Sequence, residues 1–574
     1  MAFQLSPGVL VQEKDLTAIV PSVATSAGAF AGAFQWGPVG QVTTVDSENN
    51  LVKYFGGPND ENFTSFFTAA NFLTYGNNLK LVRVVNEATS KNAIANANAT
   101  AIVIKNYDDF LASRSSGGYG LGEFAAKYPG ALGNSLKVSM VDGNTWAAYN
   151  GFSGNAWPYQ AEFNSAPGTS VYASTLAGSN DELHVIVIDE DGAWSGVRDT
   201  VLEKYSYVSK ASDSKNTDGS SNYYKDIINT QSEYVWSIDH PTTGTNWGTT
   251  VSGKTFANLS TNVSVSLSKG VSDEANVTAG NVIAGFNLFA NDELYDVSLI
   301  PLGPWSNTAA VVSAALTIAE DRKDCVIFLS PSYESVVNIS PSLQATNVVN
   351  WRNASTTTGG VNSSYAIMDS GWKYQYDRYN DKYRWVTLNG DIAGICARTD
   401  DLAESWFSPG GFNRGQIRNV VKLAFNPSKT DRDTLYKAGI NPVVAFPGQG
   451  TVLFGDKTML AKPSAFDRIN VRRLFIVLEK AIATASKFQL FEFNDPFTRA
   501  QFKNLVEPFL RDVQGRRGIS DFRVICDETN NTGDVIDRNE FRADIYIKPA
   551  RSINFISLTF VAARSGISFE EIGA

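Results

Sequence analysis

The clearest hydrophobic periodicity in the chain lies between residues 466 and 560. A second helix in this stretch is predicted to begin at Asp495–Pro496, because an acidic cap followed by proline favours a helix start. Pro508 predicts a kink within it, and Gly515 and Gly518 mark its end. The first helix is predicted from apolar side chains at steps of three, four and seven residues, which share one helical face: Val471, Leu474, Leu478, Ile482 and Ala485.

Alternation replaces helical spacing after these helices. Phe541, Ala543, Ile545 and Ile547 alternate with more polar residues, and alternation returns over residues 556–560. A period of two is typical of a half-buried strand. The sequence therefore predicts a compact α+β C-terminal module over residues 466–565, with both helices packed on an antiparallel sheet.

The preceding part of the chain has a different pattern. Residues 27–34 and 79–85 predict buried strands, and residues 66–75 predict a helix between them, an order that favours an α/β layer. We interpret residues 21–87 together with 346–465 as a discontinuous α/β middle domain.

Residues 88–345 are rich in Ser, Thr, Asn, Gly and Asp and contain short strands such as 183–188. Residues 209–223 are almost all small and polar, which predicts an exposed loop. Two further strand patterns, at 296–300 and 324–329, flank a predicted helix at 309–322 and return to an α/β order. We interpret the whole stretch as a β-rich outer insertion, so the predicted fold class is α/β and α+β multidomain.

Each end of the chain carries one short apolar run without a neighbouring partner strand. We interpret residues 1–20 as an N-terminal arm that joins the C-terminal module, and residues 566–574 as a C-terminal arm. An unpaired strand can add to the sheet of another molecule. The sequence alone favours the alternative, in which the ends pair within their own chain or fray. The inter-subunit candidates are Val9, Leu10, Val11, Ile567, Phe569 and Ile572.

Composition limits the possible functions. At 574 residues with 43% hydrophobic and 18% charged residues, the chain is expected to be globular, with two to four domains. A net charge of −10 argues against nucleic acid as a partner. The sequence shows no secretory signal and no apolar run of the roughly 18 residues that a membrane span needs, so no direct membrane insertion is expected. Cys325, Cys396 and Cys526 are isolated and are expected to be buried free thiols.

No catalytic, cofactor-binding or metal site is predicted. Residues 450–458 resemble a phosphate loop, but Asp456 separates the second glycine from Lys457, whereas the phosphate loop needs the lysine directly after that glycine. His184 and His240 are the only histidines, and neither has metal-ligand spacing to another His or Cys. His184 is expected to be a core or strand-face residue.

Basic residues cluster in the C-terminal module. Residues 466–517 contain ten Lys or Arg and six Asp or Glu, although the whole chain is acidic. This pattern is typical of a solvated helix face, but it also fits a surface that faces an acidic partner. The candidates are Arg473, Lys480 and Lys487, at heptad spacing, and Arg511, Arg516 and Arg517.

Long stretches of the chain resemble contractile tail sheath proteins of T-even-type bacteriophages. They occur in the same order at both ends and in the middle: FQWGP (34–38), YQYDRYNDKYRWV (374–386), DIAGICARTD (391–400), SPGGFNRGQIRNV (408–420), LFGDKT (453–458), FDRINVRRLF (466–475), TNNTGDVIDRNEF (529–541) and IYIKPARSINFISLTFVA (545–562). Compared with the largest members, the stretch between Val85 and Tyr128 is short, as though an outer subdomain were missing.

The resemblance implies a structural protein of the virion, without enzymatic activity or cofactors. It would assemble in the host cytoplasm as a helical stack of hexameric rings around the tail tube. It would contact tube, baseplate and tail terminator proteins, and contract to drive the tube through the host envelope. Neighbouring subunits would exchange their arms, and the basic residues would face the tube. The alternatives are the sheath of a related contractile injection system, an α/β hydrolase, or an adhesin that binds through the polar insertion.

Overall fold

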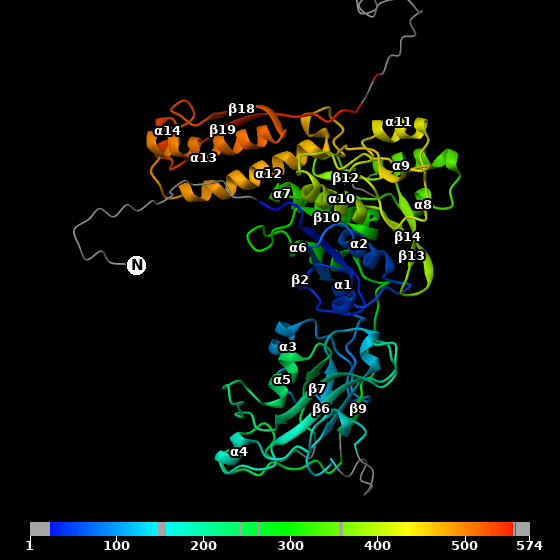
Figure 1. Cartoon of the computed structure of the whole chain (residues 1–574), viewed down its shortest axis with the longest axis vertical. Helices are drawn as coiled ribbons and strands as arrows, with labels where there is room; N and C mark the ends of the chain where they lie inside the picture. The colour runs from blue at the N-terminus through cyan, green and yellow to red at the C-terminus, as the bar shows by residue number, and fades with distance from the viewer. Residues whose placement is uncertain are drawn as a thin grey trace, which may run out of the picture. The chain divides into compact units, whose positions relative to one another are not determined.

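A computed structural model describes residues 23–146, 157–241, 244–261, 263–354, 360–554 and 557 (Figure 1). The chain divides into two compact units. One unit comprises Ala24–Leu402 and Pro409–Pro463, and the other comprises Met1–Val23, Ala403–Ser408 and Ser464–Ala574. Both predicted arms, and the predicted strand at 556–560 apart from Ser557, lie outside the described residues.

A six-stranded sheet forms the centre of the larger unit, in the order β12-β11-β10-β1-β3-β2. All neighbours pair in parallel except β2 and β3. The parallel strands are apolar along almost their whole length, as expected for a sheet covered on both faces. The strands are β1 (Gly28–Gly32), β2 (Val42–Val45), β3 (Leu79–Arg83), β10 (Leu299–Pro301), β11 (Val326–Leu329) and β12 (Ala366–Met368).

Helices cover both faces of this sheet. Gly28 of β1 faces α2 (Phe63–Leu73), whereas Ala31, three residues on and so on the opposite face, lies against α6 (Ala279–Asn287). Helix α10 (Asn389–Leu402) packs closely on α2, because a Cβ at Gly390 would lie 2.4 Å from the Thr68 carbonyl oxygen. The other helices of this part are α1 (Glu48–Phe55), α7 (Ala309–Arg322), α8 (Tyr333–Val336), α9 (Pro341–Asn353) and α11 (Lys429–Lys437).

Two small antiparallel sheets follow β12 in the chain. The first contains β13 (Trp372–Asp377), β14 (Lys382–Thr387) and β15 (Lys422–Leu423), in the order β14-β13-β15. The second pairs β16 (Val443–Phe446) with β17 (Gly450–Leu453). These sheets and the six-stranded sheet lie in the same compact unit, Ala24–Leu402 and Pro409–Pro463.

The insertion has its own β-rich core. A four-stranded antiparallel sheet has the order β7-β6-β5-β9, and a second pair joins β4 to β8. Lys91 and Val271 exchange backbone hydrogen bonds of 3.0 and 2.9 Å, so the segments that enter and leave the insertion are paired. Its elements are β4 (Phe124–Ala126), β5 (Leu136–Val141), β6 (Glu182–Asp189), β7 (Thr200–Ser209), β8 (Val235–Ser237), β9 (Val263–Ser266), α3 (Tyr107–Ser113), α4 (Val171–Thr175) and α5 (Tyr224–Gln231).

The predicted end of the insertion at residue 345 is wrong. Strands β10 and β11 and helix α7 lie between residues 299 and 329, inside the predicted insertion. They belong to the α/β body because β10 pairs with β1 and β11 pairs with β10 and β12. The insertion therefore ends shortly after the Lys91–Val271 bridge.

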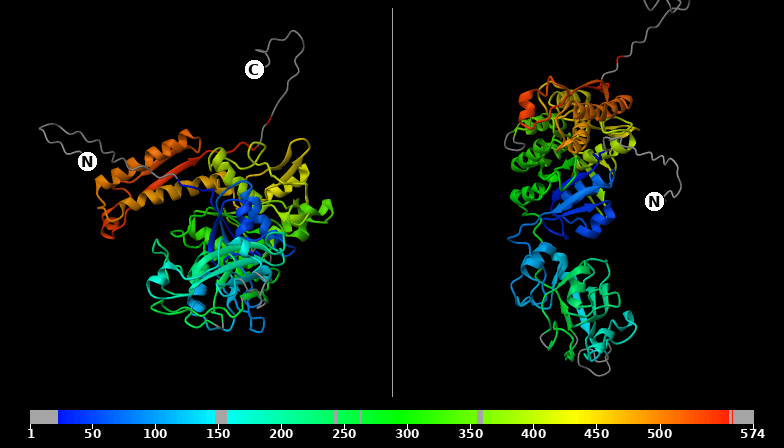
Figure 2. Two further views of the ribbon diagram at one scale, coloured as in Figure 1. Left: turned by 60° about the horizontal axis from the view of Figure 1, so that its bottom comes forward. Right: turned by 90° about the vertical axis from the view of Figure 1, so that its left-hand side faces the viewer.

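The smaller unit contains the predicted α+β module. Helices α12 (Ile469–Ser486) and α13 (Pro496–Gly515) share a core with the antiparallel pair β18 (Ile519–Ile525) and β19 (Asp544–Pro549), and Figure 2 shows both helices beside these strands. A short helix, α14 (Gly533–Asp537), lies between the strands in sequence. Asp495 caps α13 as predicted, since its carboxylate accepts the Thr498 N–H at 2.8 Å. The main side chains of this core are Leu474, Leu478, Phe502, Val506, Leu510, Val513, Ile519 and Val524.

Candidate functional site

The basic residues of α12 do not form one exposed stripe. Arg473 is only 2% exposed, beside the core residue Leu474, whereas Lys480 is half-buried. Lys487 is exposed and follows the last residue of α12. The prediction of a shared exposed face is therefore wrong for Arg473. Heptad spacing showed that the three residues lie on similar sides of the helix, but not that this side faces water.

The arginines near the end of α13 are exposed, and two of them are paired with carboxylates. Arg511 lies 3.5 Å from Glu507 on the same helix. Arg516 binds Asp512 and, at 2.7 Å, Glu404. Arg517 follows the helix with a φ of 67°, in the left-handed region. Cations at a helix C-terminus interact favourably with the helix dipole, so these residues also stabilise α13.

The sheet of the C-terminal module has unpaired edges. Within the described residues, β18 pairs only with β19, so each strand has one edge without a partner strand. Residues of β19 alternate between exposed and half-buried, as expected when one face packs on helices. Open strand edges offer backbone donors and acceptors to an added strand. This geometry is what an exchanged arm would need.

The hydrolase alternative gains no support from the buried polar groups of the larger unit. The Ser330 hydroxyl donates to the Asp369 carboxylate at 2.7 Å, and burial raises the pKa of Asp369 to about 8. The histidine that a Ser-His-Asp triad needs lies elsewhere. His184 of β6 stacks on Phe163 with ring centroids 4.2 Å apart, and His240 is bonded to the Tyr224 hydroxyl at 2.7 Å. His184 is fully buried, which confirms its predicted core position.

Residues 450–458 begin with strand β17 and do not form a phosphate loop. Asp456 is 5% exposed and accepts a hydrogen bond from the Tyr436 hydroxyl at 3.0 Å. No group of three or more His, Cys, Asp or Glu side chains that could hold a metal ion occurs in the described ranges. In the same part of the chain, none of the helices combines the length and apolar character that a membrane span needs. The three cysteines are buried free thiols, as predicted.

Three models of known protein families match the chain in order. They are described as the tail sheath protein Gp18 domain III N-terminal region (residues 28–84), the phage tail sheath protein central domain (residues 275–459) and the phage tail sheath C-terminal domain (residues 461–563). The central match begins at residue 275, in agreement with the corrected end of the insertion.

Full-length relatives carry the same description. The tail sheath protein of Enterobacteria phage T4 is 34% identical over 685 aligned residues, covering 99% of each chain. That of Vibrio phage KVP40 is 33% identical over 694 residues, again with 99% of each chain covered. These alignments are longer than the present chain, so the relatives contain segments without a counterpart here.

Solved structures show the same fold at low identity. The sheath tail protein of Listeria innocua has a TM-score of 0.53 at 11% identity, covering 92% of this chain and 96% of the other. That of Desulfitobacterium hafniense has a TM-score of 0.51 at 12% identity, covering 90% and 93%. Together, fold and similarity define a structural protein of contractile phage tails. The chain belongs to the phage tail sheath family.

The sequence interpretation missed two surface features. One is the turn between α12 and α13, which exposes several phenylalanines. The other is a pocket between α2 and β13. The turn had a signal in the sequence, because FQLFEF (488–493) is strongly apolar although it follows the end of a helical pattern. The pocket had none, since its walls come from segments about 300 residues apart in the chain.

Proposed function

We propose that this protein polymerises as helically stacked hexameric rings around a tail tube and contracts to drive the tube through the host envelope. The similarity to tail sheath proteins over 99% of the chain carries this proposal. The protein acts as a structural component of the virion and not as an enzyme. Its partners are further copies of itself, the tube, the baseplate and the tail terminator, and it assembles in the host cytoplasm without nucleic acid or membrane insertion.

Arm exchange links the subunits in this proposal. The open edges of β18 and β19 support it, because strand addition satisfies backbone groups that water otherwise solvates. Such contacts are heterologous, and repetition of a heterologous contact produces rings or helices. Arms that stay paired while the folded bodies rotate would keep neighbouring subunits linked during contraction.

Electron microscopy of the purified protein tests polymerisation directly. We expect hollow, striated tubes from the protein alone or after co-expression with a tube protein. Discrete particles under both conditions would contradict the proposal. The alternative is that this protein is the sheath of a related contractile injection system. The sheath of an extracellular contractile injection system has a similar fold, with a TM-score of 0.50 at 11% identity. That match covers 98% of this chain and 99% of the other. Co-assembly with a phage tube protein distinguishes the two.

The exposed basic residues of the C-terminal module are proposed to face the tube. We expect the combined variant Lys487→Ala, Arg511→Ala and Arg517→Ala to bind the tube more weakly. Each exposed charge contributes only about 0.2–1 kcal/mol, but the loss is repeated in every subunit. Co-sedimentation of sheath and tube at low and high salt measures the effect, which should shrink as salt screens the charges. Lys215→Ala, on the insertion, is the matched control, and equal binding of both variants would contradict a tube-facing role.

A further inference from the structure

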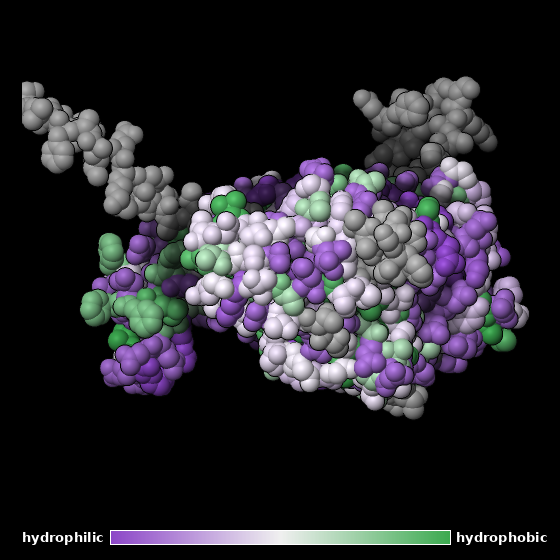
Figure 3. Space-filling model, turned by 90° about the horizontal axis from the view of Figure 1, so that it is seen from below, coloured by the Kyte–Doolittle hydropathy of each residue, from purple (hydrophilic) through white to green (hydrophobic). Residues whose placement is uncertain are grey.

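The turn between α12 and α13 exposes an apolar cluster, here called the aromatic turn (residues 488–497). Phe491 is fully exposed and Phe493 is 84% exposed, and Figure 3 shows hydrophobic side chains gathered at this end of the C-terminal module. Soluble proteins rarely expose contiguous apolar patches, and such patches mark interaction sites. The remaining exposed members are Phe488, Leu490 and Phe497.

The backbone of the aromatic turn is held in place by its own module. Asn494 donates from its side-chain amide to the Asn531 side chain at 3.1 Å and to the Glu540 carbonyl at 2.8 Å. Phe491 has a φ of 72°, a left-handed conformation that costs a bulky residue about 1–3 kcal/mol. The turn therefore presents its phenylalanines to solvent from a fixed backbone, although both the exposure and the conformation are unfavourable.

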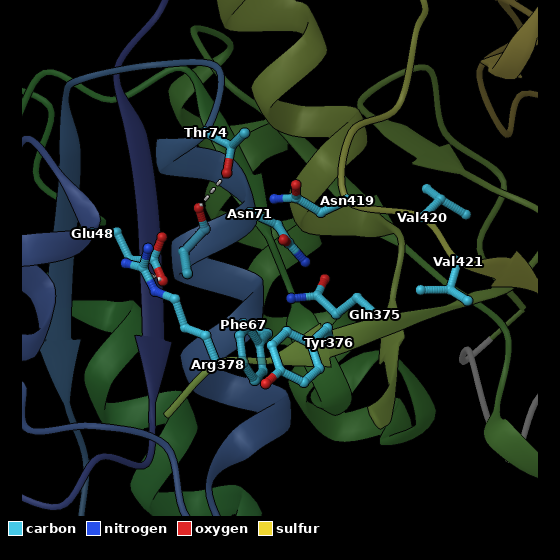
Figure 4. A pocket seen from close by; sticks show the side chains of 11 residues that line it. Glu48, Phe67, Asn71, Thr74, Gln375, Tyr376, Arg378, Asn419, Val420 and Val421 are labelled. Atoms are coloured by element: carbon cyan, nitrogen blue, oxygen red, sulfur yellow. Dashed lines mark hydrogen bonds and ion pairs between the residues drawn. The ribbon is translucent and has the colours of Figure 1, made fainter. Parts of the chain in front are cut away.

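The larger unit contains a pocket that fits such a side chain. The pocket lies between α2 and β13 and has a volume of about 340 Å³ (Figure 4). This volume is near the lower end for pockets that hold small organic ligands, about 300 Å³, and leaves room for an aromatic ring. Phe67, Ala70 and Val421 supply apolar wall, and Tyr376 adds a second aromatic ring.

Two buried amides in the pocket wall have atoms without a hydrogen-bond partner. They are Nδ2 of Asn71 and Oε1 of Gln375, and the two side chains are 2% and 3% exposed. A buried polar atom without a partner costs about 1–3 kcal/mol. Both atoms are covered by the surrounding protein, so a docked peptide group reaches them only after the two side chains turn towards the pocket. The apolar wall is what suits the pocket to an aromatic side chain.

The charges around the pocket match those of the aromatic turn. Arg378 lies in the pocket wall, 3.3 Å from Glu48, and Arg418 binds the carbonyl of the wall residue Thr74 at 2.9 Å. The aromatic turn carries the exposed carboxylates Glu492 and Asp495. Glu48 lines the pocket as well and offsets Arg378, so the two arginines leave a small excess of positive charge to meet the acidic, apolar turn.

We propose that the aromatic turn of one copy docks into the α2–β13 pocket of a second copy. This inference rests on the proposed polymerisation, in which the surfaces that surround each copy belong mostly to identical copies. A protruding turn and a pocket at different places on the same chain form a heterologous contact, which extends as a helix unless the rotation closes it. The contact links the C-terminal module of one subunit to the α/β body of the next.

Disulfide cross-linking tests which segments meet. Phe491→Cys is placed in one preparation and Val421→Cys in another, and the two are co-assembled and oxidised. We expect disulfide-linked dimers from the mixture. The three natural cysteines are buried and should not form competing cross-links. Val197→Cys, an exposed position on the insertion, replaces Val421→Cys as the control. Equal cross-linking with the control, or none with Val421→Cys, would overturn the proposal.

A charge exchange tests the energetic role of the contact. Glu492→Arg is expected to raise the protein concentration needed for assembly of the sheath alone by about tenfold, equivalent to about 1.4 kcal/mol per contact. Arg378→Glu should act similarly, and the double variant should recover assembly. If Glu492→Arg polymerises normally alone but fails to bind the tube, the turn faces the tube and the proposal is overturned. If the wild-type protein does not polymerise, the result contradicts the proposed function as well.

Discussion

A chain that lacks residues 1–20 is expected to fold normally but not to polymerise. The reason is the two-stranded sheet β18–β19, whose outer edges have no partner strand among the described residues. In the arm-exchange proposal, each subunit fills an open edge of its neighbour with the apolar run at residues 9–11. Removal of residues 1–20 therefore eliminates a row of backbone hydrogen bonds at every contact between subunits along the polymer. Analytical sedimentation and electron microscopy measure the degree of assembly, and circular dichroism checks the fold.

Two full-length variants show whether assembly depends on the apolar run itself or on the length of the arm. Replacing Val9, Leu10 and Val11 by serine should impair assembly almost as much as the truncation. Replacing Glu13, Lys14 and Asp15 by serine keeps the length and the apolar run, so it should have little effect. Normal polymers from the truncated chain would show that subunit contacts do not depend on the arm. The same design applies to Ile567, Phe569 and Ile572 in the C-terminal arm.

Replacing Lys373 by methionine is expected to destabilise the larger unit by about 3–5 kcal/mol, the typical result when one partner of a buried ion pair is removed. The Lys373 ammonium is fully buried, 2.8 Å from Oδ1 of Asp391 and 3.0 Å from the Arg418 carbonyl. Asp391 also accepts a hydrogen bond from the Tyr75 hydroxyl at 3.0 Å. Without the lysine, a buried carboxylate would keep its desolvation cost and lose its counter-charge.

The pH dependence follows from Asp391. Burial raises the pKa of Asp391 even with Lys373 present, and removal of the lysine raises it further. A raised folded-state pKa means that the folded protein binds the proton more tightly than the unfolded chain. The stability of the variant therefore falls as the pH rises from the unfolded pKa, about 3.9, towards the folded one. Urea denaturation at pH 4.5 and pH 7.5 should show the larger loss at pH 7.5.

Two controls define this effect. The double variant Lys373→Met and Asp391→Asn removes both charges and should recover much of the stability. Lys382→Met breaks the exposed ion pair between Lys382 and Asp60, in which the two side chains are 53% and 70% exposed. This substitution should lower the free energy of unfolding by less than about 1 kcal/mol. A loss below about 1 kcal/mol for Lys373→Met would show that water or another cation compensates the carboxylate.

The elements with regular periodicity were predictable from the sequence. The helix at 309–322 and the strand at 183–188 were found because their patterns are local, and so were both helices of the C-terminal module. The end of the insertion was not predictable in this way. Strand β10 lies beside β1 through parallel pairing between residues about 270 positions apart, and β11 joins the sheet through β10. No local pattern encodes such an order.

Surface features were harder to predict than the core. Hydrophobicity alone assigns an apolar segment to the interior, so the exposed phenylalanines of the aromatic turn were not anticipated. The burial of Arg473 shows the opposite case, in which a charged residue at a plausible surface position lies in the interior. Both depend on tertiary packing, which spacing along one helix does not determine.

The paired segments at Lys91 and Val271 make the insertion an exchangeable cassette. Its two connections to the α/β body run side by side, and an inserted domain needs only that its two ends lie close together. A foreign domain with adjacent termini can be grafted at this position, provided that it also covers Trp36 and Arg83 of the α/β body, which pack against the present insertion. A polymer of such chimaeras would display one copy of the grafted domain per subunit, in a regular helical array.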